Sequence, residues 1–296
     1  MRDDLPAWRS MLFVPVTAEK FVNTGADRGA DAIILDLEDS IAPSQKERAR
    51  TLIADAIPRV ARNSADVLVR VNRPWRLLVR DLEAAVIPGV AALMLTKVDS
   101  AEHVHAVAEI VDELEAERGL PAGKLQFVAL VETAAGFFRL EAIAKSHPRV
   151  VGISLGTEDF TASVGMLPDP DALLYPKQHT VFAARAAGIL PLGFVGSIAD
   201  FRDQNAFRAI VSRSNRLGFV GASAIHPLQV PVLNEEFSPT AAEVDRAERM
   251  VAAYDQAYAE GVGAVQFEGA MIDIPVVERA RTVLKRAAAL RVHSKG

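Results

Sequence analysis

Eight short apolar runs, spread along the chain, constrain its fold more than any other feature of the sequence. They are rich in Val, Ile and Leu and occupy residues 10–15, 32–38, 67–72, 92–98, 126–132, 151–157, 190–197 and 219–226. Runs of this kind are typical of parallel strands buried on both faces. They begin roughly 25 to 40 residues apart, which leaves room for a crossover helix after each strand. We therefore predict an α/β fold, a (β/α)8 TIM barrel, over residues 1–234.

The segments between these runs have helical patterns. Asp99 or Ser100 can cap a helix that follows the fourth run and ends near Gly119. Apolar residues recur there every three or four positions, at Val104, Val107, Val111 and Leu114. A doubly wound sheet around a nucleotide is the alternative architecture, but the motifs G-x-G-x-x-G and G-x-x-x-x-G-K-[ST] do not occur in the chain. The barrel is the favoured fold.

Residues 235–296 exceed what an eightfold barrel needs, and we predict a C-terminal helical extension there. Thr240 and Glu243 have the spacing of a capping box that opens a first helix. A turn at 268–269 joins two short strands, and a final helix spans about residues 276–289. We expect this extension to pack on the barrel or on a neighbouring subunit.

Composition and charge argue against several classes of function. The chain has no Cys, which excludes disulfides, thiolate nucleophiles, Cys-ligated zinc and iron–sulfur clusters. Its net charge of -5 argues against neutralising phosphate backbones, so no nucleic acid partner is expected. The N-terminus lacks the apolar core of a secretory signal, and no apolar window of about 18 residues could span a membrane. We expect a cytoplasmic protein.

Acidic residues stand at the ends of the fifth and sixth runs. Glu132 ends the fifth run, and Glu158 and Asp159 follow the sixth. The carboxyl ends of neighbouring parallel strands meet at the mouth where α/β barrels keep their active sites, and oxygen ligands with room for water suit Mg²⁺. Glu132 and Asp159 are therefore our candidate metal ligands. The alternative is that each acid caps a helix N-terminus, where negative charge is favoured.

Other charged residues fall at the same mouth of the predicted barrel. They are Lys20, Asp36, Glu38, Asp39, Arg70, Lys97 and His226. Arg70 lies inside an apolar run, so it needs a partner, which is either a substrate carboxylate or Asp36 or Glu38. Arg70 can bind a substrate carboxylate and one of these acids at the same time. For His226 a substrate-facing role and a structural role are equally supported. A mouth lined by acids and bases suits a metal that holds an anionic substrate.

The residues at these strand ends resemble the motifs of one enzyme family. They are Arg9-Ser-Met-Leu-Phe-Val-Pro15, Ala32-Ile-Ile-Leu-Asp-Leu-Glu-Asp39, Val69-Arg-Val-Asn72, Leu130-Val-Glu-Thr-Ala-Ala-Gly136, Gly156-Thr-Glu-Asp-Phe160 and Ala224-Ile-His-Pro227. In this order they resemble the citrate lyase beta subunit-like branch of the HpcH/HpaI aldolase/citrate lyase family, which includes malyl-CoA and citramalyl-CoA lyases. The resemblance extends from Arg9 to about Ala289.

The resemblance implies a site assembled in a homotrimer or a hexamer. Glu132 and Asp159 fall on the family's Mg²⁺ ligands, and Arg70 falls on its binder of the substrate carboxylate. Glu132, Lys20 and His226 are expected to contact the substrate as well. Asp36 and Glu38 would lie behind them, around the metal and its waters. The segment at 271–275 resembles one that carries a catalytic aspartate, here Asp273, into a neighbouring subunit's site.

The implied activity is that of a Mg²⁺-dependent carbon–carbon lyase. It would cleave or condense a short hydroxyacyl-CoA, such as malyl-CoA or citramalyl-CoA, through an enolate. Arg70 would fix the carboxylate, and Asp273 would exchange a proton with the acetyl methyl carbon. The alternatives are a thioester hydrolase, a CoA-independent aldolase for 2-oxo acids, and a citrate lyase beta subunit that is active only in a complex.

Several positions depart from the family pattern. Pro15-Val-Thr17 replaces a familiar Pro-Gly-Asn, Thr96 replaces a Pro, and Ala222-Ser223 replaces a Gly-Lys. Where relatives often have Leu-Leu-Tyr-Ala-Arg, this chain has Leu173-Leu-Tyr-Pro-Lys177. These positions surround the expected path of the CoA arm, so they bear on CoA binding and on the identity of the acyl group.

Overall fold

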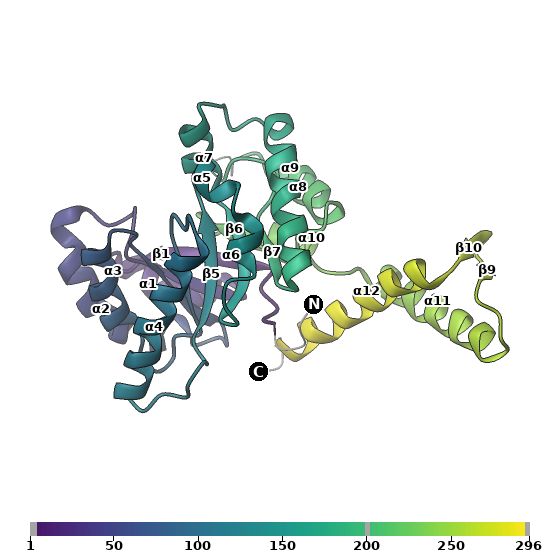
Figure 1. Cartoon of the computed structure of the whole chain (residues 1–296), viewed down its shortest axis with the longest axis horizontal. Coiled ribbons are helices and arrows are strands. Elements are labelled where there is room, and N and C mark those ends of the chain that lie inside the picture. The colour runs from purple at the N-terminus through teal and green to yellow at the C-terminus, as the bar shows by residue number, and fades with distance from the viewer. Residues whose placement is uncertain (1–4, 199–201, 294–296) are drawn as a thin grey trace. The chain divides into compact units, whose positions relative to one another are not determined.

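Eight parallel strands form the sheet of the N-terminal part of the chain, in the order β7-β6-β5-β4-β3-β2-β1-β8 (Figure 1). The computed structural model describes residues 5–198 and 202–293. The strands are β1 (Ser10–Pro15), β2 (Ala32–Asp36), β3 (Asp66–Val71), β4 (Ala92–Leu95), β5 (Gln126–Val131), β6 (Val150–Leu155), β7 (Leu190–Leu192) and β8 (Ala222–Ala224). Every pair of neighbours in this order is parallel.

The sheet curls until its two edge strands, β7 and β8, nearly meet. Ser10 of β1 pairs with Ala222 of β8, which continues the ladder beyond β1. Between the two edges, Leu192 forms a single parallel bridge with Gly221, and the N–H of Gly193 donates to the carbonyl oxygen of Gly221 at 2.8 Å. The predicted (β/α)8 barrel is confirmed as a nearly closed eight-stranded barrel.

Helices alternate with these strands and pack around them (Figure 1). They are α1 (Glu19–Gly25), α2 (Lys46–Val60), α3 (Trp75–Ala85), α4 (Ala101–Glu117), α5 (Ala134–Phe137), α6 (Leu140–Ala144), α7 (Thr157–Val164), α8 (Pro170–Ala187), α9 (Gln204–Arg216) and α10 (Gln229–Glu236), with short 3₁₀ turns at Ala26–Arg28 and Pro43–Gln45. Ser100 caps α4 as predicted, because its side chain accepts a hydrogen bond from the N–H of His103.

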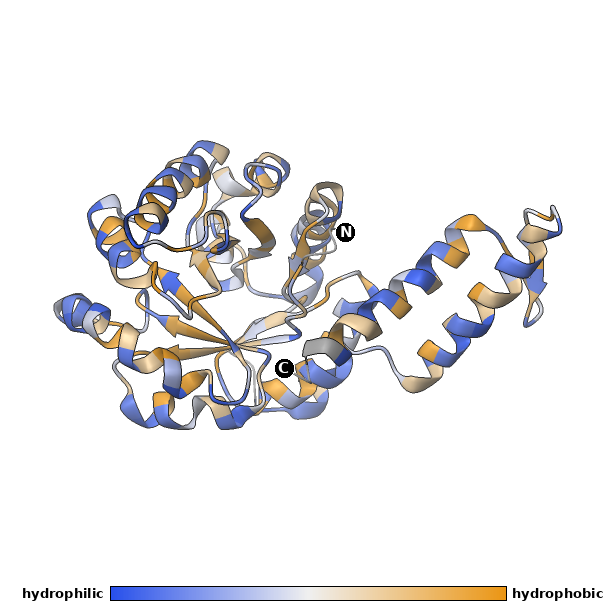
Figure 2. Cartoon of the chain, turned by 90° about the horizontal axis from the view of Figure 1, so that it is seen from below, coloured by the Kyte–Doolittle hydropathy of each residue, from blue (hydrophilic) through white to orange (hydrophobic). Residues whose placement is uncertain are grey.

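The strands bury both of their faces, which explains why they read as continuous apolar runs. One core cluster joins strand residues to the helices and includes Leu12, Ile33 and Val69. The other consists almost entirely of strand residues, such as Met11 and Ile34, and fills the barrel. Neighbouring residues of a strand alternate between the two clusters, as the pleat of a strand requires. Figure 2 shows apolar residues concentrated on the strands, with polar residues on the outer helices.

Several predicted strands extend beyond the strands of the structure at the carboxyl end. The run at 190–197 forms a strand only over Leu190–Leu192, and the next residue, Gly193, has a φ of 132°. The run at 219–226 contributes only Ala222–Ala224, because the N–H groups of Ile225 and His226 donate to the side chain of Gln229 instead of a neighbouring strand. These residues form the loops of the barrel mouth.

A second compact unit spans Ser238–Gly296. It contains α11 (Ala241–Ala259), the antiparallel strands β9 (Val265–Phe267) and β10 (Ala270–Ile272), and α12 (Ile274–His293). The capping box of Thr240 and Glu243 is present. The core of this second unit contains Met250, Tyr254, Ile272 and Val277. Among the residues described in either unit, no helix is both long and apolar enough to span a membrane.

The barrel closure generates a stability prediction at Gly221. A Cβ atom at this position would lie 1.9 Å from the carbonyl oxygen of Trp8. Because that atom belongs to the backbone leading into β1, it cannot move without disturbing the pairing of β1 with β8. We expect Gly221→Ala to lower the free energy of unfolding by at least about 3 kcal/mol. Urea denaturation monitored by circular dichroism measures this loss.

Gly25→Ala is the matched control. A Cβ atom at Gly25 would meet side-chain atoms at 3.6 to 3.9 Å, which is ordinary contact. The residue ends α1 with a helical φ, so Ala is compatible with its backbone. The variant should change the free energy of unfolding by less than about 1 kcal/mol. Equal losses in the two variants would contradict the steric explanation.

Candidate active site

A pocket of about 350 Å³ opens at the carboxyl ends of the strands. Its walls include residues from the ends of β1, β2, β3, β5, β6, β7 and β8. Five carboxylates and two cations line it, namely Asp36, Asp39, Glu132, Glu158, Asp159, Arg70 and Lys177. Four residues predicted for the site, Asp36, Arg70, Glu132 and Asp159, are therefore brought together. Lys20, His226, Glu38 and Asp273 are not among its lining residues.

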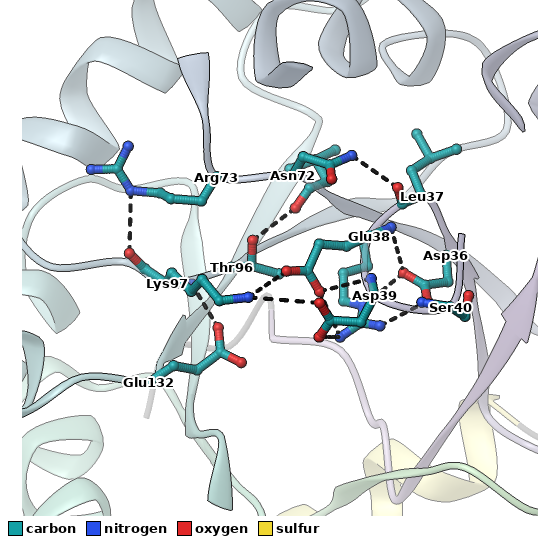
Figure 3. A network of polar contacts seen from close by, with 12 residues as sticks. Asp36, Leu37, Glu38, Asp39, Ser40, Asn72, Arg73, Thr96, Lys97 and Glu132 are labelled. Carbon is teal, nitrogen blue, oxygen red and sulfur yellow. Dashed lines mark hydrogen bonds and ion pairs between the residues drawn. The ribbon is translucent and has the colours of Figure 1, made fainter. Parts of the chain in front are cut away.

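Glu132 is held rigidly at the end of β5, with only 3% of its surface exposed. Its Oε2 accepts a hydrogen bond of 2.7 Å from the backbone N–H of Lys97, a residue with a φ of 50° (Figure 3). On its other side the backbone of Gly156 approaches so closely that a Cβ there would lie 2.7 Å from Cγ of Glu132. The strand ends β4 and β6 thus fix the carboxylate from both sides.

Burial raises the pKa of the Glu132 carboxyl to about 8, and the negative charges of Asp159 and Glu38 act in the same direction. The hydrogen bond and the positive charge from Lys97 oppose this rise. A cation placed next to a buried carboxyl group stabilises its charged form. A metal ion bound beside Glu132 would therefore lower this pKa and keep the carboxylate charged at neutral pH.

The helix-cap alternative holds for Asp159 only in its position at a helix N-terminus, and neither acid forms a capping hydrogen bond. Thr133, not Glu132, caps α5, because its side chain accepts from the N–H of Gly136. Asp159 lies exposed in the first turn of α7, where no side-chain cap hydrogen bond is formed. Both carboxylates border the same pocket.

The donor set fits Mg²⁺ bound by few protein ligands. Among hydrogen bonds between described residues, none reaches Oε1 of Glu132, so this oxygen is available to a cation. The described part of the chain has no group of three or more His, Cys, Asp or Glu residues placed to hold a metal. Two carboxylates suffice for Mg²⁺, because it keeps several waters or substrate oxygens in an octahedral shell.

Arg70 is engaged by three carboxylates. Its Nε and Nη2 each bind one oxygen of Asp36 at 2.7 Å, and its Nη1 lies 3.0 Å from Glu38 and 3.5 Å from Asp39. The guanidinium also lies over the ring of Phe13, 4.7 Å from its centroid. Burial opposes the charge on Arg70, but the hydrogen bonds and charge of Asp36 raise its pKa above the ordinary value. The structural ion pair considered from the sequence is present, in a residue that also borders the pocket.

Glu38 and Lys97 connect this ion pair to the candidate metal site. Nζ of Lys97 lies 2.5 Å from Oε1 of Glu38, while its backbone N–H binds Glu132 (Figure 3). Lys46 holds the same loop from behind, because its Nζ donates to the carbonyl oxygens of Leu37 and Glu38. Glu38 therefore positions other charged groups and does not line the pocket itself.

Lys20 and His226 lie in an adjoining pocket of about 460 Å³. This pocket is formed by α1, β1 and the loop after β8, and it shares Phe13, Pro15 and Ile225 with the first one. Lys20 is exposed, and Nδ1 of His226 accepts a hydrogen bond from the N–H of Leu228. Lys20 and His226 thus line the adjoining pocket and not the region around Glu132.

The sequence analysis named Lys177 only as a departure from the family pattern near the expected CoA arm, and not as a site residue. It projects from α8 into the wall of the pocket with 2% of its surface exposed, and its Nζ donates to the carbonyl oxygen of Leu155 at 2.6 Å. Burial lowers its pKa to about 7, and the charge of Glu158 opposes this. One signal was available, because Lys177 occupies the buried stripe of its helix, four residues after Leu173 and four before Val181.

Asp273 belongs to the C-terminal unit. It follows β10 and is exposed, and its backbone carbonyl accepts from the N–H groups of Val276 and Val277 in the first turn of α12. All the residues that line the main pocket belong to the barrel unit. The assignment of Asp273 to catalysis stays a prediction.

Comparisons with known proteins agree on one family. The HpcH/HpaI aldolase/citrate lyase family matches residues 9–227. The citrate lyase subunit beta of Leuconostoc mesenteroides subsp. cremoris is 34% identical over 284 residues, which cover 95% of this chain and 93% of that protein. The L-malyl-CoA/beta-methylmalyl-CoA lyase of Rhodobacter capsulatus is 34% identical over 307 residues and covers 96% of each.

A solved structure resembles the whole chain. Protein CitE of Mycobacterium tuberculosis, in complex with magnesium, acetoacetate and coenzyme A, superposes with a TM-score of 0.74 at 30% sequence identity. The match covers 97% of this chain and 100% of that one.

The raised pKa of Glu132 generates a prediction about pH and stability. Between its ordinary value of 4.5 and about 8, the folded protein keeps a proton that the unfolded chain releases, so the wild type loses stability as the pH rises through this window. Glu132→Gln removes this titration. Relative to wild type, the variant should gain about 2 to 4 kcal/mol in unfolding free energy between pH 4.5 and pH 9. Urea denaturation in EDTA measures it, and parallel pH profiles for the two proteins would refute the assignment.

Proposed function

The chain belongs to the HpcH/HpaI aldolase/citrate lyase family, and on this premise we propose that it is a Mg²⁺-dependent lyase acting on a short hydroxyacyl-CoA of the malyl-CoA or citramalyl-CoA type. The family predicted from the sequence is confirmed. The enzyme class is confirmed as well, because the relatives are named citrate lyase subunits and malyl-CoA lyases, which are carbon–carbon lyases.

One observation carries the proposal. A buried carboxylate, Glu132, has an oxygen that no described residue hydrogen-bonds, in a pocket that the neighbouring strand end supplies with a second carboxylate, Asp159. Magnesium accompanies pyruvate and acetoacetate in structures of M. tuberculosis CitE, which supports the same metal here. Bound by Glu132 and Asp159, Mg²⁺ would supply a Lewis acid that polarises the carbonyl oxygen of the 2-oxo acid.

The remaining residues position the substrate and the charges around it. Asp36 holds Arg70 through two hydrogen bonds, so that the guanidinium faces the pocket in one orientation and can contact a substrate oxygen. Lys97 fixes Glu132 through its backbone and Glu38 through its side chain. Because these groups are ordered before the substrate arrives, little reorganisation is needed during the reaction.

The adjoining pocket suits the remainder of a thioester. It is lined mainly by apolar side chains, with Lys20 and Arg28 as cations near its edge. It connects with the candidate metal site through Phe13 and Ile225. We place the CoA arm there, with Lys20 and His226 in contact with it, because coenzyme A is present in the related CitE structure.

Asp273 would act on the acetyl half of the substrate. In cleavage, the hydroxyl group would release its proton to solvent, the carbon–carbon bond would break, and its electron pair would pass to the thioester as an enolate. Asp273, in its acid form, would then protonate the methylene carbon of the enolate to give the acetyl methyl group. In condensation the same carboxylate removes that proton. We propose that Asp273 enters the pocket of a neighbouring subunit in a homotrimer or a hexamer, located in the cytoplasm.

The proposal is tested by product formation from (S)-malyl-CoA and (S)-citramalyl-CoA, with Mg²⁺ or EDTA. We expect metal-dependent release of acetyl-CoA with glyoxylate or pyruvate. Glu132→Ala should abolish the effect of Mg²⁺, and Asp273→Asn should lower kcat by about 10²- to 10⁴-fold, because a proton transfer is lost.

The products distinguish the alternatives. Free CoA together with malate or citramalate would indicate a thioester hydrolase. Cleavage of free 4-hydroxy-2-oxo acids without CoA would indicate an aldolase. No turnover until citrate lyase alpha and acyl carrier subunits are added would indicate a beta subunit that works in a complex, a possibility favoured by the citrate lyase relatives.

Coexpression of two inactive variants tests where Asp273 acts. If it acts in a neighbouring subunit, hybrids of Glu132→Ala and Asp273→Asn contain sites in which both groups are intact. With random mixing, about a quarter of the sites should be restored. Separately purified variants that are mixed without exchange of subunits serve as the control. Hybrids as inactive as the parents would place Asp273 in its own subunit's site or outside the chemistry.

A further inference from the structure

The two cations that line the main pocket differ in how their charge is compensated. Arg70 faces Asp36, Glu38 and Asp39, all within 3.5 Å. Lys177 forms no ion pair with any residue that the structure describes, and its hydrogen bond goes to a neutral acceptor, the carbonyl oxygen of Leu155. The unpaired positive charge of the pocket is therefore on Lys177, although the sequence had pointed to Arg70.

Burial makes this difference important. An ammonium group with 2% exposure is cut off from water, and a lone charge in such a place is costly unless an opposite charge lies beside it. The same burial lowers the pKa of Lys177 to about 7 in the structure without ligand. The charged group that acts on it is Glu158, on α7.

Lys177 and Ser154 lie close to the backbone of Gly193, and all three residues line the main pocket. The position of a Cβ atom built on Gly193 lies 3.7 Å from Nζ of Lys177, 3.6 Å from Oγ of Ser154 and 3.4 Å from Cε1 of Phe219. Gly193 therefore places no side chain between the ammonium group of Lys177 and the hydroxyl group of Ser154. Both can donate hydrogen bonds to the same acceptor.

We propose that Lys177, with Ser154, forms an anion-binding subsite above Gly193 that pairs with a carboxylate oxygen of the 2-oxo acid half of the substrate. This inference rests on the proposed function for the identity of the ligand. It makes Lys177 the charge partner of the substrate, while Arg70, already neutralised by carboxylates, orients it.

Binding of pyruvate and of its uncharged analogue pyruvamide tests the subsite, measured by titration calorimetry with Mg²⁺ present. Lys177→Met keeps the apolar stem and removes the charge. It should raise the Kd of pyruvate about 10- to 100-fold, the range for a charge-assisted hydrogen bond, and change that of pyruvamide less than about twofold. Lys177→Arg should retain most of the affinity for pyruvate, because it keeps the charge.

Thr180→Val is the matched control on the same helix. Thr180 is buried, its hydroxyl group binds the carbonyl oxygen of Pro176, and it does not line the pocket. The variant should bind both ligands as the wild type does. If Lys177→Met does not fold, Ser154→Ala carries the test and should weaken pyruvate about 3- to 10-fold without affecting pyruvamide.

Two results would overturn the inference. One is an unchanged affinity for pyruvate in Lys177→Met, or in Ser154→Ala if that variant replaces it. The other is an equal loss of affinity for pyruvate and pyruvamide. The measurement is independent of turnover. Charge-selective loss of pyruvate binding in an enzyme that cleaves no thioester would refute the proposed lyase and keep the subsite. Normal thioester cleavage with an unchanged KM in Lys177→Met would refute the subsite and keep the proposed lyase.

Discussion

The parallel backbone ladder is the constraint on which the rest of this structure depends. Because all eight strands run in one direction, their carboxyl ends meet at one mouth, and residues 120 positions apart or more become neighbours around one pocket. The ladder nearly closes through Gly221, where only a residue without a side chain allows the approach of the Trp8 backbone. The geometry of the site thus depends on a contact made below it, in the barrel wall.

Within the mouth, burial decides which charges act together. Asp36 and Arg70 are paired on adjacent strands in register, so each compensates the other and both are fixed in place. Glu132 is buried beside other carboxylates and lacks such compensation, which raises its pKa and favours a bound cation. Lys177 is a buried cation without an ion-pair partner among the described residues, which favours a bound anion. In the proposed function, a metal ion and an anionic oxo acid would supply what these two groups lack.

The C-terminal unit has a separate role in this scheme. It has its own small core around Tyr254, Ile272 and Val277, so it folds around contacts of its own. Asp273 stands exposed between β10 and α12, directly before the first residue of α12. A unit of this kind can carry a catalytic group to a site built by other residues, and the proposed oligomer gives it one.

The sequence by itself determined the barrel, the capping box of Thr240 and Glu243, and the convergence of Glu132 and Asp159, because these follow from local periodicity and from the direction of parallel strands. It narrowed the cap of α4 to Asp99 or Ser100, and the structure shows Ser100. It could not decide where strands end, since Gly193 and Gln229 act there through backbone geometry and a side-chain hydrogen bond. Only the tertiary structure placed Lys20 and His226 in an adjoining pocket, showed that three carboxylates already surround Arg70, and brought Lys177 from a distant helix to the wall of the site. The reason is physical: periodicity reports which face of an element is buried, whereas the compensation of a buried charge depends on groups from several elements that become neighbours only when the barrel closes.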